Sequence, residues 1–312
     1  LDNILGGSVA GVMTSMISGE PGKNISNLLI RGIGTFGAND GALVLIDGLE
    51  GRLQDVDPDD VQSFAILKDA AATAVYGVRG ANGVVLITTK RGVSGKIQIS
   101  ARATTQINQL RRLPEYLGAY DYAKLANEAR ALSGENDLYT SLDLDVIKNN
   151  LDPELYPNVN WFDEILKKTS MQQRYYMSAR GGGDVAQYYV SIGGQFEDAA
   201  YKQEDVKFKR PVAYNKLTYR ANIDKKLTPK TKMYFGVDGF ITTHTLPGFS
   251  NTTQLWRTAQ MLTPLMFPVK YSDGTLPTYG TEDMSSPYTN LNYNGFSTSN
   301  GNKYMLTLEV AQ

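Results

Sequence analysis

The sequence contains no cysteine and a single histidine, His244. Disulfides, thiolate nucleophiles and cysteine-bound metals are therefore excluded, and a Ser-His-Asp mechanism would depend on that one imidazole. The formal net charge is −1, so no basic excess indicates binding to nucleic acid or to an anionic membrane surface. We expect no catalytic residues, no metal site and no cofactor; structural calcium held by hard oxygens in the loops or in a partner remains an alternative.

Long hydrophobic runs are also absent. The longest apolar run, residues 42–46, is far shorter than the ~20 residues of a membrane-spanning helix, but strands of a membrane barrel need only ~9–11 residues of alternating character. The chain is instead rich in tyrosine and glycine, with 19 and 30 residues, which favours β-structure with hydrated aromatic surfaces. It begins without Met and ends inside a strand-like run, so we expect a portion of a longer precursor.

A glycine motif at residues 32–37, Gly-Ile-Gly-Thr-Phe-Gly, has the spacing of a dinucleotide-binding loop. Such a loop needs a strand before it and a helix that begins within it. Here a turn sequence at 38–41 and a β-like run at 42–46 follow, and four residues cannot form the crossover helix of a βαβ unit. We therefore interpret the glycines as part of a strand–turn–strand segment and reject the nucleotide-binding hypothesis.

The first 93 residues are predicted to form a small mixed α/β domain. A helix is expected over residues 59–72, because acids and a proline at 57–60 suit its first turn. Its buried face would carry Val61, Phe64, Ala65 and Leu67. The other predicted elements are strands at 28–31, 42–47 and 84–89 and a glycine-rich loop at 76–83.

The remaining residues, 94–312, alternate between apolar and polar side chains in six segments. In one of them Leu217, Tyr219, Ala221 and Ile223 share one face, while Lys216, Arg220 and Asp224 share the other. This sorting suits a membrane strand, because a cation on the lipid face near the midplane would cost ~2–4 kcal/mol. The predicted strands are centred on residues 97–104, 171–180, 187–196, 216–224, 233–241 and 304–310.

The links between these strands alternate in length. Tight turns at 181–184 and 227–230 alternate with a medium loop at 196–214 and long insertions at about 110–170 and 246–302. Outer-membrane barrels have short periplasmic turns and longer extracellular loops, whereas the strands of a soluble β-sandwich alternate without this asymmetry. We therefore predict that residues 94–312 form part of a membrane β-barrel. An open six-stranded sheet would leave two edges unpaired in lipid, so we expect further strands beyond residue 312.

An ordered series of motifs between residues 27 and 92 supports this prediction. Its signature residues are Arg31, Gly32, Asp47, Gly48, Lys68, Asp69, Tyr76, Gly77, Gly80 and Gly83, and the series ends with Thr88-Thr89-Lys90-Arg91-Gly92. The series resembles the plug domain of TonB-dependent outer-membrane transporters, in the SusC/RagA-like branch of the Bacteroidota, although Gly41-Ala42 stands where a Pro-Leu pair is common. The resemblance implies that the α/β domain lies in the lumen of the barrel. Plugged barrels have about 22 strands, so we expect about sixteen more strands beyond residue 312.

The resemblance implies energy-dependent import of a nutrient across the outer membrane of a Gram-negative bacterium. The implied cargo is an oligosaccharide or, as the second choice, a peptide; the implied partners are a SusD-like surface lipoprotein and the TonB–ExbB–ExbD complex. The TonB-binding segment cannot be assigned in this chain. The alternatives are a glycan receptor that signals without bulk import, and a soluble enzyme that uses the glycine loop.

Candidate substrate contacts lie in two plug loops, 33–40 and 76–82, and in the last long insertion. Aromatic rings beside amides and hydroxyls suit sugar rings, peptides or a partner protein, and they equally suit packing within the loops. Plug residues with charged side chains are candidates for contacts with the barrel wall or for holding the plug together: Arg31, Asp47, Lys68, Asp69 and Arg79. The candidate substrate residues are Thr35, Phe36, Asn39, Asp40, Arg79, Asn82, Trp256, Tyr271, Tyr279 and Tyr288.

Overall fold

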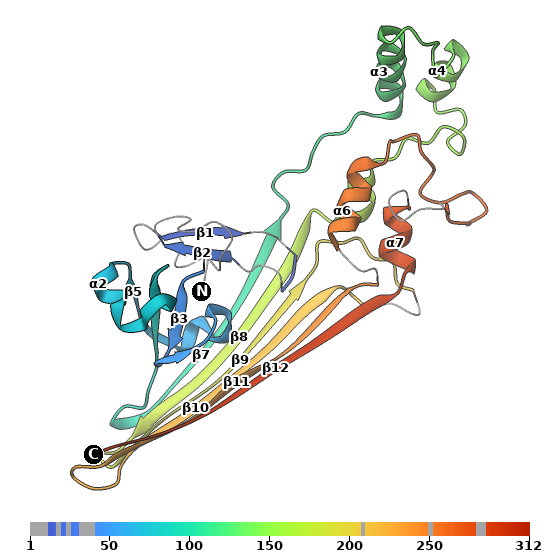
Figure 1. Ribbon diagram of the computed structural model, residues 1–312. Helices are drawn as coiled ribbons and strands as arrows, with labels where there is room; N and C mark the ends of the chain where they lie inside the picture. The colour runs from blue at the N-terminus through green and yellow to red at the C-terminus, as the bar shows by residue number, and fades with distance from the viewer. Residues whose placement is uncertain are drawn as a thin grey trace.

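A computed structural model of the chain describes residues 12–16, 20–22, 26–30, 41–206, 210–248, 252–278 and 285–312. A long six-stranded sheet dominates the structure, and a smaller four-stranded sheet lies beside it (Figure 1). We call the six-stranded sheet the wall, and we call residues 41–92 the plug. A separate two-stranded pair, β1 (Val12–Met16) and β2 (Ser26–Ile30), is antiparallel.

The plug sheet has the strand order β4-β3-β6-β5. β3 (Leu43–Ile46) and β6 (Val84–Thr89) are parallel, as expected for strands joined by a crossover, and their predicted positions are confirmed. β4 (Leu49–Glu50) and β5 (Val61–Leu67) pair with them in antiparallel fashion. The hydrophobic core of this unit consists of Ile30, Ile46, Leu53, Val56, Val85 and Ile87.

The predicted helix over residues 59–72 is wrong. Asp57 accepts a hydrogen bond from the Asp59 backbone N–H at 2.9 Å, and this cap serves a single 3₁₀ turn, η2 (Pro58–Asp60). The chain then enters strand β5, where β-branched and aromatic side chains favour pairing with β6. Only the short helix α2 (Ala70–Thr73) follows. Pairing with β6 therefore outweighs the local helix-start signal. The acids of that signal contact the wall instead, as described below.

The predicted glycine-rich loop contains regular turns. η3 (Ala74–Gly80) is a 3₁₀ segment interrupted at Gly77, where φ is 60°. Gly83 ends this region with a φ of 95°, and a Cβ atom there would lie 2.7 Å from Ile30 Cδ1. Glycine is therefore required at Gly83 both by the backbone conformation and by the close approach of the plug core.

The wall confirms the six predicted strands. Its strand order, β12-β11-β10-β9-β8-β7, follows the sequence, and every neighbouring pair is antiparallel. Each strand has at least 13 residues, more than the ~9–11 that span a bilayer. The strands are β7 (Gly95–Gln109), β8 (Thr169–Gly182), β9 (Ala186–Asp198), β10 (Ala213–Lys226), β11 (Lys232–Pro247) and β12 (Phe296–Ala311).

One face of the wall is apolar, as the alternation predicts. The registers place Ile223 beside Phe235, and Phe235 beside Leu308, so apolar rows cross from strand to strand. All three side chains are exposed, as a surface covered by lipid would be. The other exposed apolar side chains of the wall include Ile97, Ile99, Met177, Val190, Ile192, Leu217, Ile241, Leu306 and Val310.

The connections between wall strands differ in length at its two ends. Links 183–185 and 227–231 are short, whereas 110–168, 199–212 and 248–295 are long, in the predicted order. The first and the third of the long links carry helices, which lie at the end of the wall opposite the C-terminus (Figure 1). They are α3 (Ala119–Leu132), α4 (Ser141–Lys148), α5 (Trp161–Ile165), α6 (Thr252–Met261) and α7 (Pro287–Tyr293). Within the described residues, no helix combines the length and hydropathy needed to cross a membrane.

Candidate functional site

The plug meets the wall through a row of aspartates. Asp47 follows β3, Asp55 ends the 3₁₀ turn η1 (Leu53–Asp55), and Asp57, Asp59 and Asp60 surround η2. The side chains of all five are largely buried and face cations or hydroxyls of the wall. Carboxylates withdrawn from water need such partners, because an unpaired buried charge is strongly destabilising.

Arg220 of β10 occupies the centre of this interface, and its side chain is 5% exposed. The guanidinium lies 3.4 Å from Asp47 Oδ2 and 3.8 Å from Asp60 Oδ2, both in the plug, and 3.6 Å from Asp238 Oδ2 on β11. Its Nη1 also donates to Thr89 Oγ1 at 3.1 Å, and Thr89 in turn binds Asp47 through its N–H and its hydroxyl. One wall cation thus joins two plug acids and one wall acid.

Asp60 also binds two tyrosines of the wall. The hydroxyls of Tyr176 on β8 and Tyr189 on β9 donate to Asp60 Oδ1 at 2.8 and 2.6 Å, and the two hydroxyl oxygens lie 2.6 Å apart. All three side chains are buried. In a low-dielectric interface such a connected network is strong only while each member keeps its partners.

Asp57 and Asp59 extend the interface toward β7 and β8. Arg174 lies 3.1 Å from Asp57 Oδ1 and 3.8 Å from Asp59 Oδ2, and Arg102 lies 2.5 Å from Asp59 Oδ1. Burial raises the pKa of Asp57, although the hydrogen bond from the Asp59 backbone and the charge of Arg174 oppose that rise. Gly193 of β9 leaves the room for this carboxylate, since a Cβ atom there would lie 2.9 Å from Asp57 Oδ2.

Asp55 reaches the far strand of the wall. Lys303 of β12 binds Asp55 Oδ2 at 2.8 Å, and Lys216 of β10 donates to the backbone carbonyl of the neighbouring Gln54. Burial alone would raise the pKa of Asp55, but the hydrogen bonds from Lys303 and from the Arg52 backbone leave that pKa below its ordinary value. The ionised form of Asp55 is therefore the one that suits the assembled interface.

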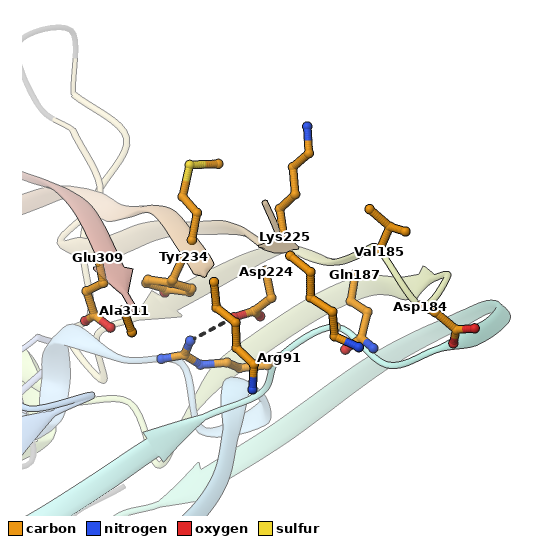
Figure 2. Close-up of a pocket in the computed structure, with 13 residues that line it drawn as sticks. Arg91, Asp184, Val185, Gln187, Asp224, Lys225, Tyr234, Glu309 and Ala311 are labelled. Atoms are coloured by element: carbon orange, nitrogen blue, oxygen red, sulfur yellow. Dashed lines mark hydrogen bonds and ion pairs between the residues drawn. The ribbon is translucent and has the colours of Figure 1, made fainter. Parts of the chain in front are cut away.

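The last residues of the plug attach to the wall near its short turns. Arg91 Nη1 binds Asp224 Oδ1 of β10 at 3.1 Å, and its guanidinium lies 3.9 Å from the centre of the Tyr234 ring. Figure 2 shows Arg91 extending from the plug tail to Asp224, with Tyr234 beside it. These residues line a pocket of about 480 Å³ together with Gln187 and Glu309.

The predicted site residues differ in where they lie and in what they contact. Asp47 contacts the wall, whereas Arg79 binds Glu50 Oε1 of the plug itself at 2.5 Å, and both side chains of that pair are exposed. Lys68 and Asp69 lie between β5 and α2, and Asn82 lies between η3 and β6. Gly48 follows Asp47 with a φ of 88°; Tyr76, Gly77 and Gly80 lie in η3. The predictions for Arg31, Gly32, Thr35, Phe36, Asn39, Asp40 and Tyr279 concern positions outside the described residues.

Four acids of the interface were missed by the sequence analysis. The acids at 57–60 were assigned to a helix start, whereas Asp57, Asp59 and Asp60 pair with cations of the wall, and Asp55 was not singled out at all. The signal that was available lay in the wall, where alternation places Arg174 and Arg220 on the polar face. Cations inside a barrel require acidic partners, so the acid-rich plug segment could have been predicted to supply them.

The predicted substrate aromatics of the last insertion pack largely within the loops. The Trp256 ring lies 5.4 Å from the Phe162 ring. Tyr288 is buried, and its hydroxyl donates to Glu204 of another loop, as does the Tyr293 hydroxyl at 3.1 Å. Burial, followed by the hydrogen bond to Glu204, raises the pKa of Tyr288.

Three long loops share one hydrophobic core. Because that core draws residues from all three, the loops form a single structured platform, with the turn at Tyr271 at its edge. Aromatic packing explains Trp256 and Tyr288 without a ligand. The core contains Trp161, Phe162, Ile165 and Leu166 of the first loop, Ala199, Tyr201 and Val212 of the second, and Leu255, Ala259, Leu262, Phe267, Tyr288 and Leu291 of the third.

Known sequences match the chain along most of its length. Residues 1–84 match the family described as TonB-dependent Receptor Plug Domain. TonB-dependent receptor P26 of Formosa agariphila is 31% identical over 245 residues, which cover 76% of this chain and 23% of that protein. TonB-dependent receptor SusC of Bacteroides thetaiotaomicron is 31% identical over 202 residues, which cover 61% of this chain and 18% of that protein. The chain thus spans about a fifth of the length of these relatives.

Solved structures agree with the sequence matches. The RagAB peptide importer in its closed-closed state superposes with a TM-score of 0.64 at 25% identity, covering 90% of this chain and 34% of that chain. The open-open state gives a TM-score of 0.67 at 22% identity, covering 90% of this chain and 33% of that chain, which supports the fold. The plug family match, the SusC-type relatives and this fold identify the chain as a SusC/RagA-like TonB-dependent receptor sequence, with a plug domain followed by part of the barrel wall.

Proposed function

We propose that the chain belongs to a transporter that imports a nutrient across the outer membrane of a Bacteroidota bacterium, with energy from the TonB–ExbB–ExbD complex. The complete plug domain would take in residues 1–93 and thus include the plug as defined above, and residues 94–312 would form the first part of the barrel with its extracellular loops. The observation that carries this proposal is the contact set around Arg220, where Asp47 and Asp60 of the plug meet one guanidinium of the wall.

This interface suits a plug that is held firmly and then released. The hydrophobic core of the plug is built from plug residues and Ile30 of β2, with no residue of the wall, so separation from the wall leaves that core intact. The contacts that must break are ion pairs and hydrogen bonds, such as those of Asp57, Asp60 and Arg91. After release, water can hydrate the plug carboxylates, and the acids that remain on the wall can pair with its cations. The surfaces of an apolar interface would instead be exposed to water without compensation.

The extracellular loops are the proposed surface for cargo and lid. Their shared core makes a firm platform, so binding on top of it can be transmitted to the wall strands from which the loops arise. We propose an oligosaccharide as cargo and a peptide as the second choice, and a SusD-like surface lipoprotein as partner. The resemblance to the SusC branch supports the first cargo and the lipoprotein partner, and RagAB, which is named as a peptide importer, supports the second cargo.

Deletion of the gene and measurement of uptake test the proposal. The deletion strain should lose accumulation of at least one labelled oligosaccharide, and re-expression of the wild-type gene should restore it. Re-expression of an Arg220→Ala variant should restore less uptake than re-expression of the wild-type gene at equal surface abundance. Loss of peptide uptake alone would assign the second cargo class, and unchanged uptake of every glycan and peptide would contradict the proposal.

A further inference from the structure

The hairpin between β10 and β11 forms a basic end of the wall. Lys225, Lys226, Lys230 and Lys232 lie within eight residues, and all four are exposed. The neighbouring acid, Asp224, is already bound by Arg91. Among the residues that the structure describes, none of these four ammonium groups lies in an ion pair. The hairpin therefore presents a local excess of positive charge, although Asp184 and Glu309 line the same pocket as three of these lysines.

This charge lies at the border of the apolar face. Lys225 follows Ile223 on the outward face of β10, and its register partners are Ala186 and Met233. In Figure 2 its side chain extends to the opposite side of the strand from Asp224 and Arg91. A long lysine side chain in this place can lay its methylene stem along apolar surface and keep its ammonium at headgroup depth.

Apolar side chains accompany the lysines at the same end. Leu227 in the hairpin is 48% exposed, and Val185 in the adjacent turn is 62% exposed. The two turns are joined, because the Lys226 N–H donates to the Val185 carbonyl at 2.8 Å. Cations beside exposed aliphatic groups are typical of surfaces that contact a membrane interface rather than bulk water.

We propose that this hairpin binds the headgroup of an anionic phospholipid. Outer-membrane barrels place their short turns on the periplasmic side, so Lys225 on the outward face and Lys230 in the turn lie beside the leaflet on the plug side. Lys226 and Lys232 are register partners on the polar face and add positive charge behind them. Each lysine near an anionic lipid surface contributes about fivefold in affinity. The group to be recognised is a phosphate diester with net negative charge. Inorganic phosphate in solution lacks the acyl chains that Leu227 and Val185 would contact. The inference rests on the membrane wall and is independent of the cargo.

The full-length protein in lipid nanodiscs provides the test. Discs that contain equal amounts of phosphatidylglycerol and phosphatidylethanolamine are prepared, and the lipids retained on the protein are counted by native mass spectrometry. The wild type should retain phosphatidylglycerol at least about tenfold over the variant in which Lys225, Lys226, Lys230 and Lys232 are changed to Gln, since several lysines act together. The corresponding Lys→Arg variant should retain it as the wild type does.

A charge-matched control separates local binding from net charge. Lys124, Lys148, Lys167 and Lys168 are exposed in the first long loop, and their change to Gln alters the protein charge equally at the opposite end. This control should keep its phosphatidylglycerol, and heat-modified migration on gels should show that every variant is folded. Equal loss in the control, unchanged retention in the hairpin variant, or displacement of the lipid by excess inorganic phosphate would each overturn the proposal.

Discussion

The Tyr189 hydroxyl of the wall donates a hydrogen bond to Asp60 Oδ1 of the plug at 2.6 Å, and this bond joins two residues that are 129 positions apart in the sequence. The Tyr176 hydroxyl shares that oxygen and also lies 2.6 Å from the Tyr189 hydroxyl. Asp60 lies near Arg220 as well, so three wall strands contact one plug carboxylate. Substitution of Asp60 would therefore remove contacts to three wall strands at once.

Arg220→Ala should loosen the plug strongly. Asp47, Asp60 and Asp238 would lose their shared cation inside a buried site, and breaking a buried pair costs about 3–5 kcal/mol. Hydrogen exchange of the β6 amides, measured in detergent, should therefore become much faster. Arg79→Ala is the matched control, because its pair with Glu50 is exposed and worth about 0–1 kcal/mol. Equal protection in both variants would contradict the role of Arg220.

Tyr189→Phe should weaken the same site less. The ring remains, but Asp60 loses one donor and Tyr176 loses a hydroxyl partner, at a cost of about 1–3 kcal/mol. Tyr176→Phe should cost a similar amount, and the double variant less than the sum, since the two hydroxyls share one carboxylate. Plug protection in the two single variants and the double variant measures this coupling, and strict additivity would mean that the hydroxyls act separately.

Asp55 and Asp57 should give opposite pH dependences. The pKa of Asp55 is lowered in the folded state, so its stabilisation is complete above the ordinary aspartate pKa and is lost as pH falls through the lowered value. The pKa of Asp57 is raised, so its ionisation costs stability as pH rises from the ordinary value through the raised one.

These signs can be measured with two Asn variants. The stability advantage of wild type over Asp55→Asn should grow as pH rises, and its advantage over Asp57→Asn should shrink. Urea titration of plug unfolding at a series of pH values from acidic to neutral gives both differences. Parallel pH dependences would show that the two carboxyls have similar environments.

Gly193→Ala should push the plug away from β9. The added methyl group would lie 2.6 Å from Thr218 Oγ1 and 2.9 Å from Asp57 Oδ2, and overpacking of this kind costs about 1–3 kcal/mol. Gly183→Ala is the control, because a Cβ atom there meets nothing within 4 Å. Protease sensitivity of the plug should rise only in the first variant; a rise in both would point to a general loss of barrel stability.

Trp256→Ala should destabilise the long loops whether or not cargo is present. Its ring packs on Phe162 of another loop and borders the shared core, so its removal leaves a cavity. Limited proteolysis should cut the long loops faster in the variant. Normal proteolysis combined with reduced cargo affinity would instead support the prediction that Trp256 contacts substrate.

The sequence by itself determined the wall. Alternation with a period of two assigns each side chain to one face of a strand, so the apolar face of Ile223, Phe235 and Leu308 and the polar face of Arg220 follow from local pattern. The order of short and long links likewise followed from the spacing of the strands. Composition alone excluded cysteine chemistry and histidine clusters.

Only the tertiary structure decided which charges meet. Residues 61–67 form a strand rather than a helix because β6 offers a pairing edge, which no local signal contains. The five plug aspartates find Arg102, Arg174, Arg220 and Lys303 because the folded plug lies against the wall in one orientation. Local pattern fixes the face on which a charge lies, whereas its partner depends on distances between segments that are remote in sequence.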